Sequence, residues 1–371
     1  MIQLPKLRKK TNKPKILLIS DDIKYSSGVG TIGREIVFWT SNQFDWVQIA
    51  AGSNHPHHGQ IFDLSEEVEK TTGYSDVYVK QYCHNQYGTP ETIRELFAKE
   101  RPNAIFLITD PRFFVHVFHM EHEIHNEFKI PIIYYSVWDN GPNAHWNAPA
   151  YASVDALLSI NRLTKLFHKA SLDYMGKSYY DADTSTGDIS DTYISYIPHG
   201  SNSNIYYPRD ESSIDWNQYK QYIDTFDKTY NNPEFVLFYN SRNIRRKQPG
   251  DVMLAFDKFC QQLPTDAAKK CLLIMKTSVV DENGTDLRAV KKYCTNSNIT
   301  FIDRYCDPIE LAYLYNRADA TIFMSSAEGF GLGANESLLC GTPIIAPITG
   351  GLQDQMRFED IDGTWFEPTM E

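Results

Sequence analysis

Two runs of alternating strands and helices organise this sequence. Short apolar segments, rich in β-branched residues, predict buried strands in the first half at 15–20, 46–51, 76–80, 104–108, 131–136, 155–160 and 192–198. A second series is predicted at 235–240, 271–276, 299–303, 320–324, 343–347 and 364–368. Helix-period segments lie between the strands, such as 90–100, which Pro90 opens. Such alternation implies parallel sheets with right-handed crossovers, formed twice along the chain.

The segment 201–234 separates the two runs and is polar and poor in strand residues. We therefore place the domain boundary near residue 210, with domains at 1–210 and 211–371. A chain of 371 residues is long enough for two such cores. Open α/β sheets bind ligands beyond the carboxyl ends of their strands. The predicted fold class is therefore α/β, with two Rossmann-like parallel-sheet domains that face a shared cleft.

Composition narrows the class of protein. With 42% hydrophobic and 22% charged residues, the chain is predicted to be globular, soluble and cytoplasmic. The net charge of −11 argues against stable nucleic-acid binding, which needs a basic face. The six cysteines show no CxxC or zinc-finger spacing and suit a reducing compartment. No apolar run is long enough to span a membrane, and the basic start at 1–15 offers only a weak contact with a membrane surface.

The stretch 325-SSAEGFGLGANESLLCGTP-343 holds a glycine-rich turn between two glutamates. Glu328 follows the predicted strand 320–324, and Glu336 is predicted in the first turn of the next helix. Bare amides at a helix start attract an anion, and glycines let a phosphate approach closely. The carboxylates would instead accept hydrogen bonds from the hydroxyls of a sugar and a ribose that flank a diphosphate. Each glutamate alone also fits a plainer role, as a helix-dipole partner or an exposed loop residue.

A basic cluster follows the first strand of the second run, in 239-YNSRNIRRKQP-249. Its side chains crowd at that strand's carboxyl end, where they could neutralise a diphosphate. They are Arg242, Arg245, Arg246 and Lys247. The alternative is a solvated basic turn, but such a cluster in an acidic chain favours a ligand.

Together these features resemble the retaining glycosyltransferases of the two-Rossmann GT-B architecture, in particular the glycosyltransferase group 1 (GT4) family. That family's paired glutamates, with glycine-phenylalanine-glycine after the first, are similar to EGFGLGANE at 328–336. Its arginine–lysine pair is matched by Arg242 and Lys247. Further stretches that resemble family segments are SSGVG (26–30), IPHGSNSNIYYP (197–208), RADATIFMSS (317–326) and GTPIIAPITGGLQDQM (341–356). The resemblance covers nearly the whole chain and is strongest over 235–356.

The resemblance implies an enzyme of class EC 2.4 that moves a sugar from a nucleotide-diphosphate donor to a hydroxyl with retention. It implies that Arg242 and Lys247 hold the diphosphate and stabilise the leaving group. It implies that Glu336 binds the ribose and that Glu328 contacts the transferred sugar. Further implied donor contacts are Gly28 and Gly30 of the amino-terminal domain, the backbone of Gly331, Leu332 and Gly333, and, near the base, Tyr305.

By the same resemblance, the domain 1–210 takes the acceptor and 211–371 takes the donor. The donor is a co-substrate, and neither a cofactor nor a metal is expected. The acceptor stays open among a glycan, a lipid, a protein and a modified nucleobase. Two other functions also stay open: a sugar-nucleotide epimerase of similar architecture and a non-catalytic nucleotide-sugar-binding protein.

Two departures from the family pattern are apparent. The family often has a histidine after the strand that corresponds to 131–136, whereas this chain has SVWDN there. Asp139 is the candidate to orient the acceptor or a donor hydroxyl, and a loop-capping role fits it equally well. His145 and His199 are spare candidates. In the family, helices that follow the last strand cross back to the amino-terminal domain. This chain ends at Glu371, before such helices, which predicts a truncated chain.

Other motifs point elsewhere but are weaker. The sequence GVGTIG (28–33) matches the dinucleotide fingerprint of NAD-dependent oxidoreductases, yet it starts too far past the strand end at Ser20. Asp181 and Asp183 match the metal-binding DxD of another glycosyltransferase architecture, but we interpret them as solvated loop acids. Histidines recur on a predicted helix, where adjacent members could share a metal but four cannot converge. They are His116, His119, His122 and His125, and a loop HPHH lies at 55–58.

Overall fold

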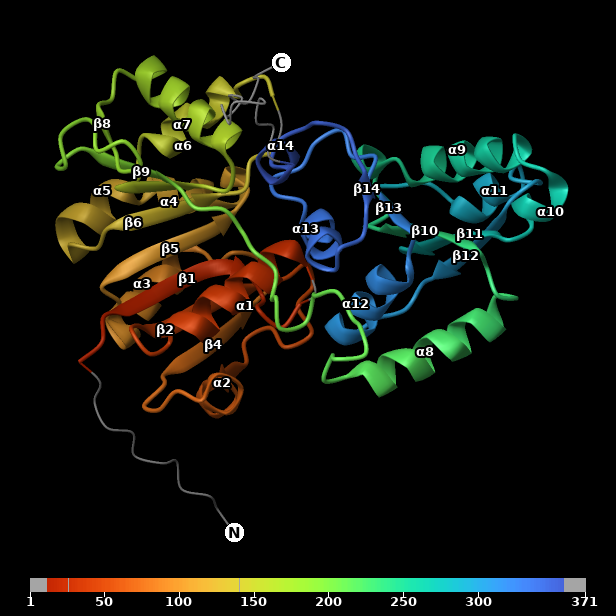
Figure 1. The fold of residues 1–371 in the computed structure, drawn as a ribbon. Helices are drawn as coiled ribbons and strands as arrows, with labels where there is room; N and C mark the ends of the chain where they lie inside the picture. Colours follow the sequence, from red (N-terminus) through yellow and green to blue (C-terminus); the bar gives the residue numbers. More distant parts are fainter. Residues whose placement is uncertain (1–11, 26, 140, 357–371) are drawn as a thin grey trace, which may run out of the picture. The chain divides into compact units, whose positions relative to one another are not determined.

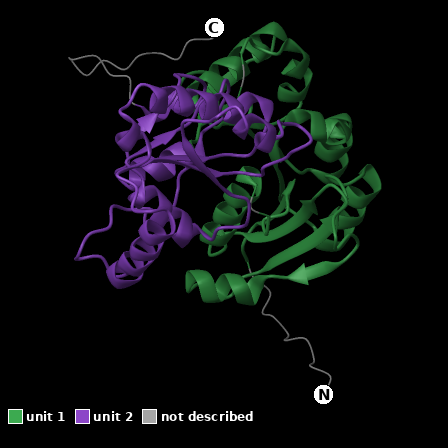
Figure 2. Ribbon diagram, turned by 90° about the vertical axis from the view of Figure 1, so that its right-hand side faces the viewer, with its two compact units in different colours: residues 1–198, 369–371 green, residues 199–368 purple. Residues whose placement is uncertain are grey.

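The computed structural model describes residues 12–25, 27–139 and 141–356 of the chain (Figure 1). These residues divide after Pro198 into two compact units (Figure 2). The division comes earlier than the predicted boundary near 210 because the intervening residues pack within the second unit. Tyr206 belongs to that unit's core, and the Arg209 amide donates to the Asn316 side chain at 2.8 Å. The predicted strand at 364–368 and the start of the chain up to residue 11 lie outside the described residues.

The first unit contains, within the described residues, a nine-stranded sheet. Its strands pair in parallel except for β3, which runs antiparallel to β4. In spatial order they are β3 (Ile61–Asp63), β4 (Val79–His84), β2 (Asp45–Ala51), β1 (Lys15–Asp21), β5 (Ala104–Thr109), β6 (Ile132–Ser136), β7 (Ala156–Ser159), β9 (Thr192–Tyr196) and β8 (Tyr179–Asp181). Leu17, Leu18 and Ile19 of β1 are all fully buried, so side chains on both faces of the sheet are covered.

Helices connect these strands, as the alternating pattern predicted. The longer ones are α1 (Gly28–Thr40), α2 (Ser65–Thr72), α3 (Pro90–Glu100) and α7 (Arg162–Tyr174). The predicted helix at 90–100 is confirmed, with Pro90 in its first turn and the Thr89 side chain accepting from the Thr92 amide. The histidine-rich segment is not one helix. It breaks at Met120 into α4 (Val115–His119), α5 (Glu121–Glu123) and a π-helical turn, Ile124–Phe128.

Two strands of the first unit were not predicted, and one was misplaced. β3 and β8 have only three residues each, too few for a recognisable pattern. The strand predicted at 76–80 lies at Val79–His84. Its inward residues include Gln81, which is fully buried in a polar network. A buried polar side chain breaks the apolar pattern from which strands are predicted.

The second unit contains, in its described part, a five-stranded parallel sheet. In spatial order its strands are β12 (Asn298–Ile302), β11 (Cys271–Lys276), β10 (Phe235–Asn240), β13 (Ala320–Ile322) and β14 (Ile344–Ile345). Helices cover both faces. They are α8 (Trp216–Thr229), α9 (Pro249–Gln261), α10 (Thr265–Ala268), α11 (Leu287–Lys291), α12 (Pro308–Arg317), α13 (Leu332–Leu339) and α14 (Leu352–Gln355).

The two faces of this sheet form separate hydrophobic cores, because successive strand residues point to opposite sides. Val236 and Phe238 of β10 pack in a core with α8, α12 and α13. Leu237 and Tyr239 pack in the other core, with α9 and α11. All six cysteines are buried and form no disulfide, as the sequence predicted for core thiols. Among the described residues, no helix has the length and apolarity needed to cross a membrane.

Candidate functional site

The glycine turn after β13 is shaped by close backbone packing. Gly331 has a φ of 88°, a left-handed conformation that favours glycine, and α13 begins at the next residue. The Gly351 amide donates to the Glu328 carbonyl oxygen at 2.8 Å. A β-carbon on Gly350 would lie 2.0 Å from that same oxygen. The Gly-Gly pair at 350–351 therefore holds the turn from one side, and neither position has room for a side chain.

Glu328 lies in this turn and is 5% exposed. Its carboxylate forms an ion pair with Lys247, and the Arg246 guanidinium lies 3.6 Å from its Oε2. Arg246 also donates to the Ala327 carbonyl oxygen, and its own carbonyl accepts from the Ser326 amide at 2.9 Å. Both cations come from the short 3₁₀ turn Arg245–Lys247 after β10. The plainer interpretation of Glu328 as an exposed loop residue is wrong.

Arg242, which was expected to hold the diphosphate together with Lys247, forms an ion pair with Asp281. Its guanidinium donates to both carboxylate oxygens of Asp281, at 2.8 and 3.2 Å. Asp281 comes from the loop after β11, which sequence reasoning did not connect with the basic cluster. The structure therefore brings Lys247 and Arg246 to the glycine turn, and Arg242 to a neighbouring loop.

Glu336 lies on α13 beside two tyrosines. The Tyr315 hydroxyl donates to its Oε2 at 3.0 Å, and the Tyr206 hydroxyl also hydrogen-bonds to it. Because α13 begins at Leu332, Glu336 is in the second turn of the helix and not in the first turn, as predicted. That position weakens the helix-dipole interpretation, since the dipole acts mainly on the first turn. Burial raises the pKa of Glu336 to about 7, against the lowering effect of both hydroxyls.

The start of α13 between the two glutamates offers hydrogen-bond donors. Gly331 is the N-cap residue of α13, and no side-chain hydrogen bond caps the helix there. The amides of Leu332 and Gly333 have no acceptor within the described part of the chain. The turn and the start of α13 thus combine two amides without an acceptor, a lysine and an arginine with two carboxylates. This arrangement can bind a phosphate through the amides and cations, and hydroxyl groups through the carboxylates.

Two further residues lie around this site in the second unit. Tyr305 is 69% exposed in the loop after β12, and its hydroxyl acts electrostatically on Tyr206, the partner of Glu336. The His199 ring lies 5.5 Å from the Phe330 ring of the glycine turn. Burial lowers the pKa of His199 to about 3, so this ring is neutral at physiological pH. Tyr305 therefore borders the Glu336 side of the site, and His199 packs on the turn.

The predicted residues of the first unit lie at the carboxyl ends of its strands. The Ser27 hydroxyl caps α1 by accepting from the Gly30 amide at 3.0 Å. A β-carbon on Gly30 would lie 2.7 Å from the Asp22 carbonyl oxygen, so the glycine serves close packing. Gly28 is the first residue of α1. Asp139 follows β6 and acts electrostatically on Arg112.

Asp181 of the DxD motif is built into the fold, and our interpretation of it as a solvated acid was wrong, whereas Asp183 is exposed. Asp181 is fully buried at the end of β8. Lys165 lies 2.6 Å from Asp181 and 2.5 Å from Asp183, and Lys169 lies 2.5 Å from Asp181. Although burial alone would raise the pKa of Asp181, the hydrogen bonds from both lysines hold it at about 2. The two lysine ammonium groups neutralise the charge of these carboxylates.

One group among the described residues has a composition that could ligate a metal: Asp22, His55 and Cys83, whose ligand atoms lie within 4.8 Å of one another. The His57 amide donates to His55 Nδ1 at 3.0 Å, which leaves the ring proton on Nε2. That nitrogen lies 2.9 Å from Asp22 Oδ2 and donates to it. In this tautomer neither ring nitrogen has a lone pair for an ion. The group is therefore better described as a hydrogen-bonded histidine–aspartate pair beside a thiol.

Comparison with known proteins connects the second unit to a family. Residues 223–371 match the family model of the glycosyl transferases group 1. This part of the chain is therefore similar to that family. The group 1 segment includes the basic turn, both glutamates and the start of α13. The glycine turn, the basic turn and both glutamates thus fall inside the matched residues, whereas Tyr206 and His199 precede them.

Curated relatives match over short stretches. The D-inositol 3-phosphate glycosyltransferase 1 of Catenulispora acidiphila is 31% identical over 126 residues, which cover 33% of this chain and 30% of that relative. The D-inositol 3-phosphate glycosyltransferase of Thermobispora bispora is 50% identical over 48 residues, 13% of this chain and 11% of the relative. The matches therefore span less than a third of these relatives' length.

Solved structures extend the likeness to both units. HepE of Anabaena, in complex with UDP and glucose, has a TM-score of 0.60 and 14% identity, covering 96% of this chain and 86% of that chain. Sucrose-phosphate synthase of Thermosynechococcus elongatus has a TM-score of 0.62 and 17% identity, covering 92% and 83%. At these identities the likeness shows the fold. The predicted fold class of two Rossmann-like α/β domains, of the GT-B kind, is confirmed.

The buried carboxyl of the group 1 segment predicts a pH dependence of stability. The pKa of Glu336 rises from 4.5 to about 7 on folding, so between these values the folded state binds the proton more tightly. The free energy of unfolding should therefore fall as the pH rises through that window. Relative to a Glu336→Gln variant, we expect the wild type to lose about 3 kcal/mol, measured by urea unfolding at several pH values. A difference between the two proteins that does not vary with pH would contradict this.

Proposed function

We propose that the protein is a retaining glycosyltransferase that moves a sugar from a nucleoside-diphosphate donor to a hydroxyl group. The observation that carries the proposal is the Lys247–Glu328 ion pair at a turn whose amides have no acceptor among the described residues, followed by a second, half-buried glutamate at Glu336. Each part suits one portion of a nucleotide sugar. A helix dipole or a solvated basic turn accounts for neither the ion pair nor the burial.

The diphosphate belongs at the amides and the cations. Lys247 and Arg246 together carry two positive charges against the single charge of Glu328. The net positive charge attracts a diphosphate, and the amides of Leu332 and Gly333 add fixed dipoles. When the bond between the sugar carbon and the diphosphate oxygen breaks, the electron pair stays on the leaving phosphate. Lys247 is placed to stabilise that charge.

The two carboxylates then have different tasks. Glu336, on α13, accepts hydrogen bonds from two tyrosine hydroxyls. When it is ionised, its carboxylate can also accept hydrogen bonds from the ribose. Glu328 is bound to Lys247 and lies on the turn itself, so it suits the hydroxyls of the sugar next to the diphosphate. An ion-paired carboxylate is a weak nucleophile, which favours a hydrogen-bonding role for Glu328 over a covalent one.

UDP-glucose is the first donor to test, because HepE, a structural neighbour, was solved with this compound. A small polyol phosphate is the first acceptor, because the curated relatives are named for D-inositol 3-phosphate. The test is a turnover assay with UDP-, GDP- and ADP-sugars, each with and without that acceptor. Release of nucleoside diphosphate that increases with acceptor supports the proposal. Interconversion of the free donor would identify an epimerase, and binding without turnover would identify a binding protein.

Transfer should not need a divalent metal. Lys247, Arg246 and the helix amides supply the positive charge that a metal would bring to the leaving group. The lysine-bound Asp181 and Asp183 offer no alternative metal site. We therefore expect the rate of nucleoside-diphosphate release to change by less than about twofold in EDTA, against a control protein dialysed without chelator. Loss of activity in EDTA that manganese restores would overturn this part of the proposal.

A further inference from the structure

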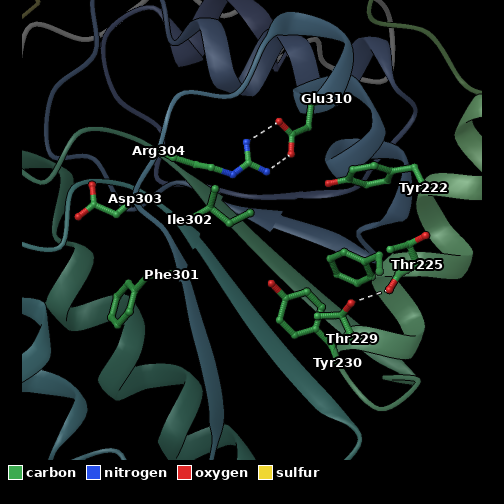
Figure 3. A pocket seen from close by; sticks show the side chains of 10 residues that line it. Tyr222, Thr225, Thr229, Tyr230, Phe301, Ile302, Asp303, Arg304 and Glu310 are labelled. Atoms are coloured by element: carbon green, nitrogen blue, oxygen red, sulfur yellow. Dashed lines mark hydrogen bonds and ion pairs between the residues drawn. The ribbon is translucent and has the colours of Figure 1, made fainter.

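A cavity of about 460 Å³ lies in the second unit between α8 and the edge strand β12 (Figure 3). β10 and β11 separate β12 from β13, so the strand spacing puts the cavity about 14 Å along the sheet from the Glu328 turn. An adjoining hollow of about 500 Å³ shares Tyr222 and Glu310 and continues along the start of α12. Both hollows have the size of small-molecule sites and lie outside the proposed donor site.

Two tyrosine hydroxyls point into this cavity from α8 and the residue after it. Figure 3 shows the oxygens of Tyr222 and Tyr230 directed toward the space beside Ile302. Neither hydroxyl hydrogen-bonds to another residue in the described part of the chain. Glu310 and Arg304 act electrostatically on Tyr222, so they border the same space. Half-buried hydroxyls without protein partners are available to a ligand.

The opposite wall is an ion pair that offers both donors and acceptors. The Arg304 guanidinium is bound to the Glu310 carboxylate in a two-pronged contact, with one N–O distance of 2.8 Å. The pair is neutral overall, and Asp303 adds a negative charge nearby. An anionic ligand would meet no net positive charge here. The wall therefore suits a neutral ligand with several hydroxyl groups.

The floor of the cavity is apolar. The Phe226 ring lies 6.5 Å from the Tyr222 ring and 4.8 Å from the Tyr230 ring. Ile302 completes the floor, whereas Phe301 points to the other face of β12, as alternation along a strand requires (Figure 3). A pyranose ring has the matching character, with apolar C–H faces and hydroxyls around its edge.

We propose that this cavity is a second carbohydrate-binding site, which takes a pyranose ring of a neutral saccharide through the Phe226–Ile302 floor, the Tyr222 and Tyr230 hydroxyls, and the Arg304–Glu310 pair. The adjoining hollow gives room for a further sugar unit. The site is distinct from the donor site and does not depend on the transfer reaction. Its role would be to retain a glycan on the surface of the second unit.

The test is a calorimetric or NMR titration of the full chain, with saturating UDP present to fill the proposed donor site. The probes are methyl α-D-glucopyranoside, methyl α-D-mannopyranoside and maltotriose, with glucose 6-phosphate as an anionic comparison. We expect saturable binding of at least one neutral sugar, unaffected by UDP. Removing both hydroxyls in Tyr222→Phe/Tyr230→Phe should weaken that binding by at least about fivefold, and each single change by less.

Tyr293→Phe is the matched control, because this tyrosine is 77% exposed and does not line the cavity. Its affinity should equal that of the wild type. Binding of none of the neutral sugars would overturn the proposal. So would a preference for glucose 6-phosphate, competition by UDP, or an unchanged affinity in the folded double and single variants. Because sugar affinity is measured without turnover, inactivity of the protein as a transferase would not affect the outcome.

Discussion

Replacing Lys247 with methionine is expected to lower the rate of donor turnover by at least about a hundredfold, the usual effect of removing one group that stabilises a leaving-group charge. The same change should lower the free energy of unfolding by about 3 kcal/mol, because Glu328 stays buried without its principal cation. Arg246, at 3.6 Å from Glu328, offsets part of that loss. Turnover assays and urea unfolding of the purified variant measure the two effects.

A double variant separates stability from chemistry. In Lys247→Met/Glu328→Gln no unpaired charge remains buried, so most of the lost stability should return. Turnover should stay as low as in the single variant. Lys269→Met is the control, since this lysine pairs with Asp266 on the surface and both side chains are well exposed. Near-normal turnover in the double variant would show that Lys247 is only a structural partner of Glu328.

The second large effect is expected at the two glutamates. Glu328→Gln should lower turnover by about a hundredfold while the affinity for UDP is unchanged or slightly higher, because Lys247 is then fully available to phosphate. Glu336→Gln should weaken binding of UDP and of the intact donor equally, by about 1.5–3 kcal/mol, as expected for a lost hydrogen bond to a charged group.

Titration of both variants with UDP and with the donor measures this difference. Tyr305→Phe is titrated in the same way for comparison with the glutamate variants. This change keeps the exposed ring and removes only its hydroxyl. Equal losses for both ligands in both glutamate variants would mean that the carboxylates have no separate tasks. If the two glutamate variants showed only small, equal losses of thermal stability, Glu336 would be a structural residue of the helix.

Much of this site could be predicted from the sequence because its parts are local. Glu328, the glycine turn and Glu336 lie within nine residues, and a strand before them and a helix after them determine their placement. The basic turn after β10 could be predicted for the same reason. The burial of Glu328 and its pairing with Lys247 depend on contacts between residues 81 positions apart. Those contacts are visible only in the folded chain.

Two side-chain pairings were not predicted because their partners are distant in the sequence. Arg242 was expected to hold the diphosphate together with Lys247, and the sequence did not indicate that its guanidinium binds Asp281, which follows a different strand. Asp181 was expected in solvent, but Lys165 and Lys169 of α7 cover its carboxylate. Charge pairs of this kind leave no periodic pattern in the sequence. Local motifs therefore predicted which segments form the site and not which of its cations face inward.

The most direct test of the central claim is the configuration of the released sugar. With UDP-glucose, or the donor that turns over best, proton NMR can follow the anomeric signal during the first minutes of transfer or hydrolysis, before mutarotation mixes the anomers. The account predicts that the product first appears with the α configuration of the donor, and that Lys247→Met nearly abolishes the signal. First appearance of the β product, or no sugar release from any donor, would contradict it.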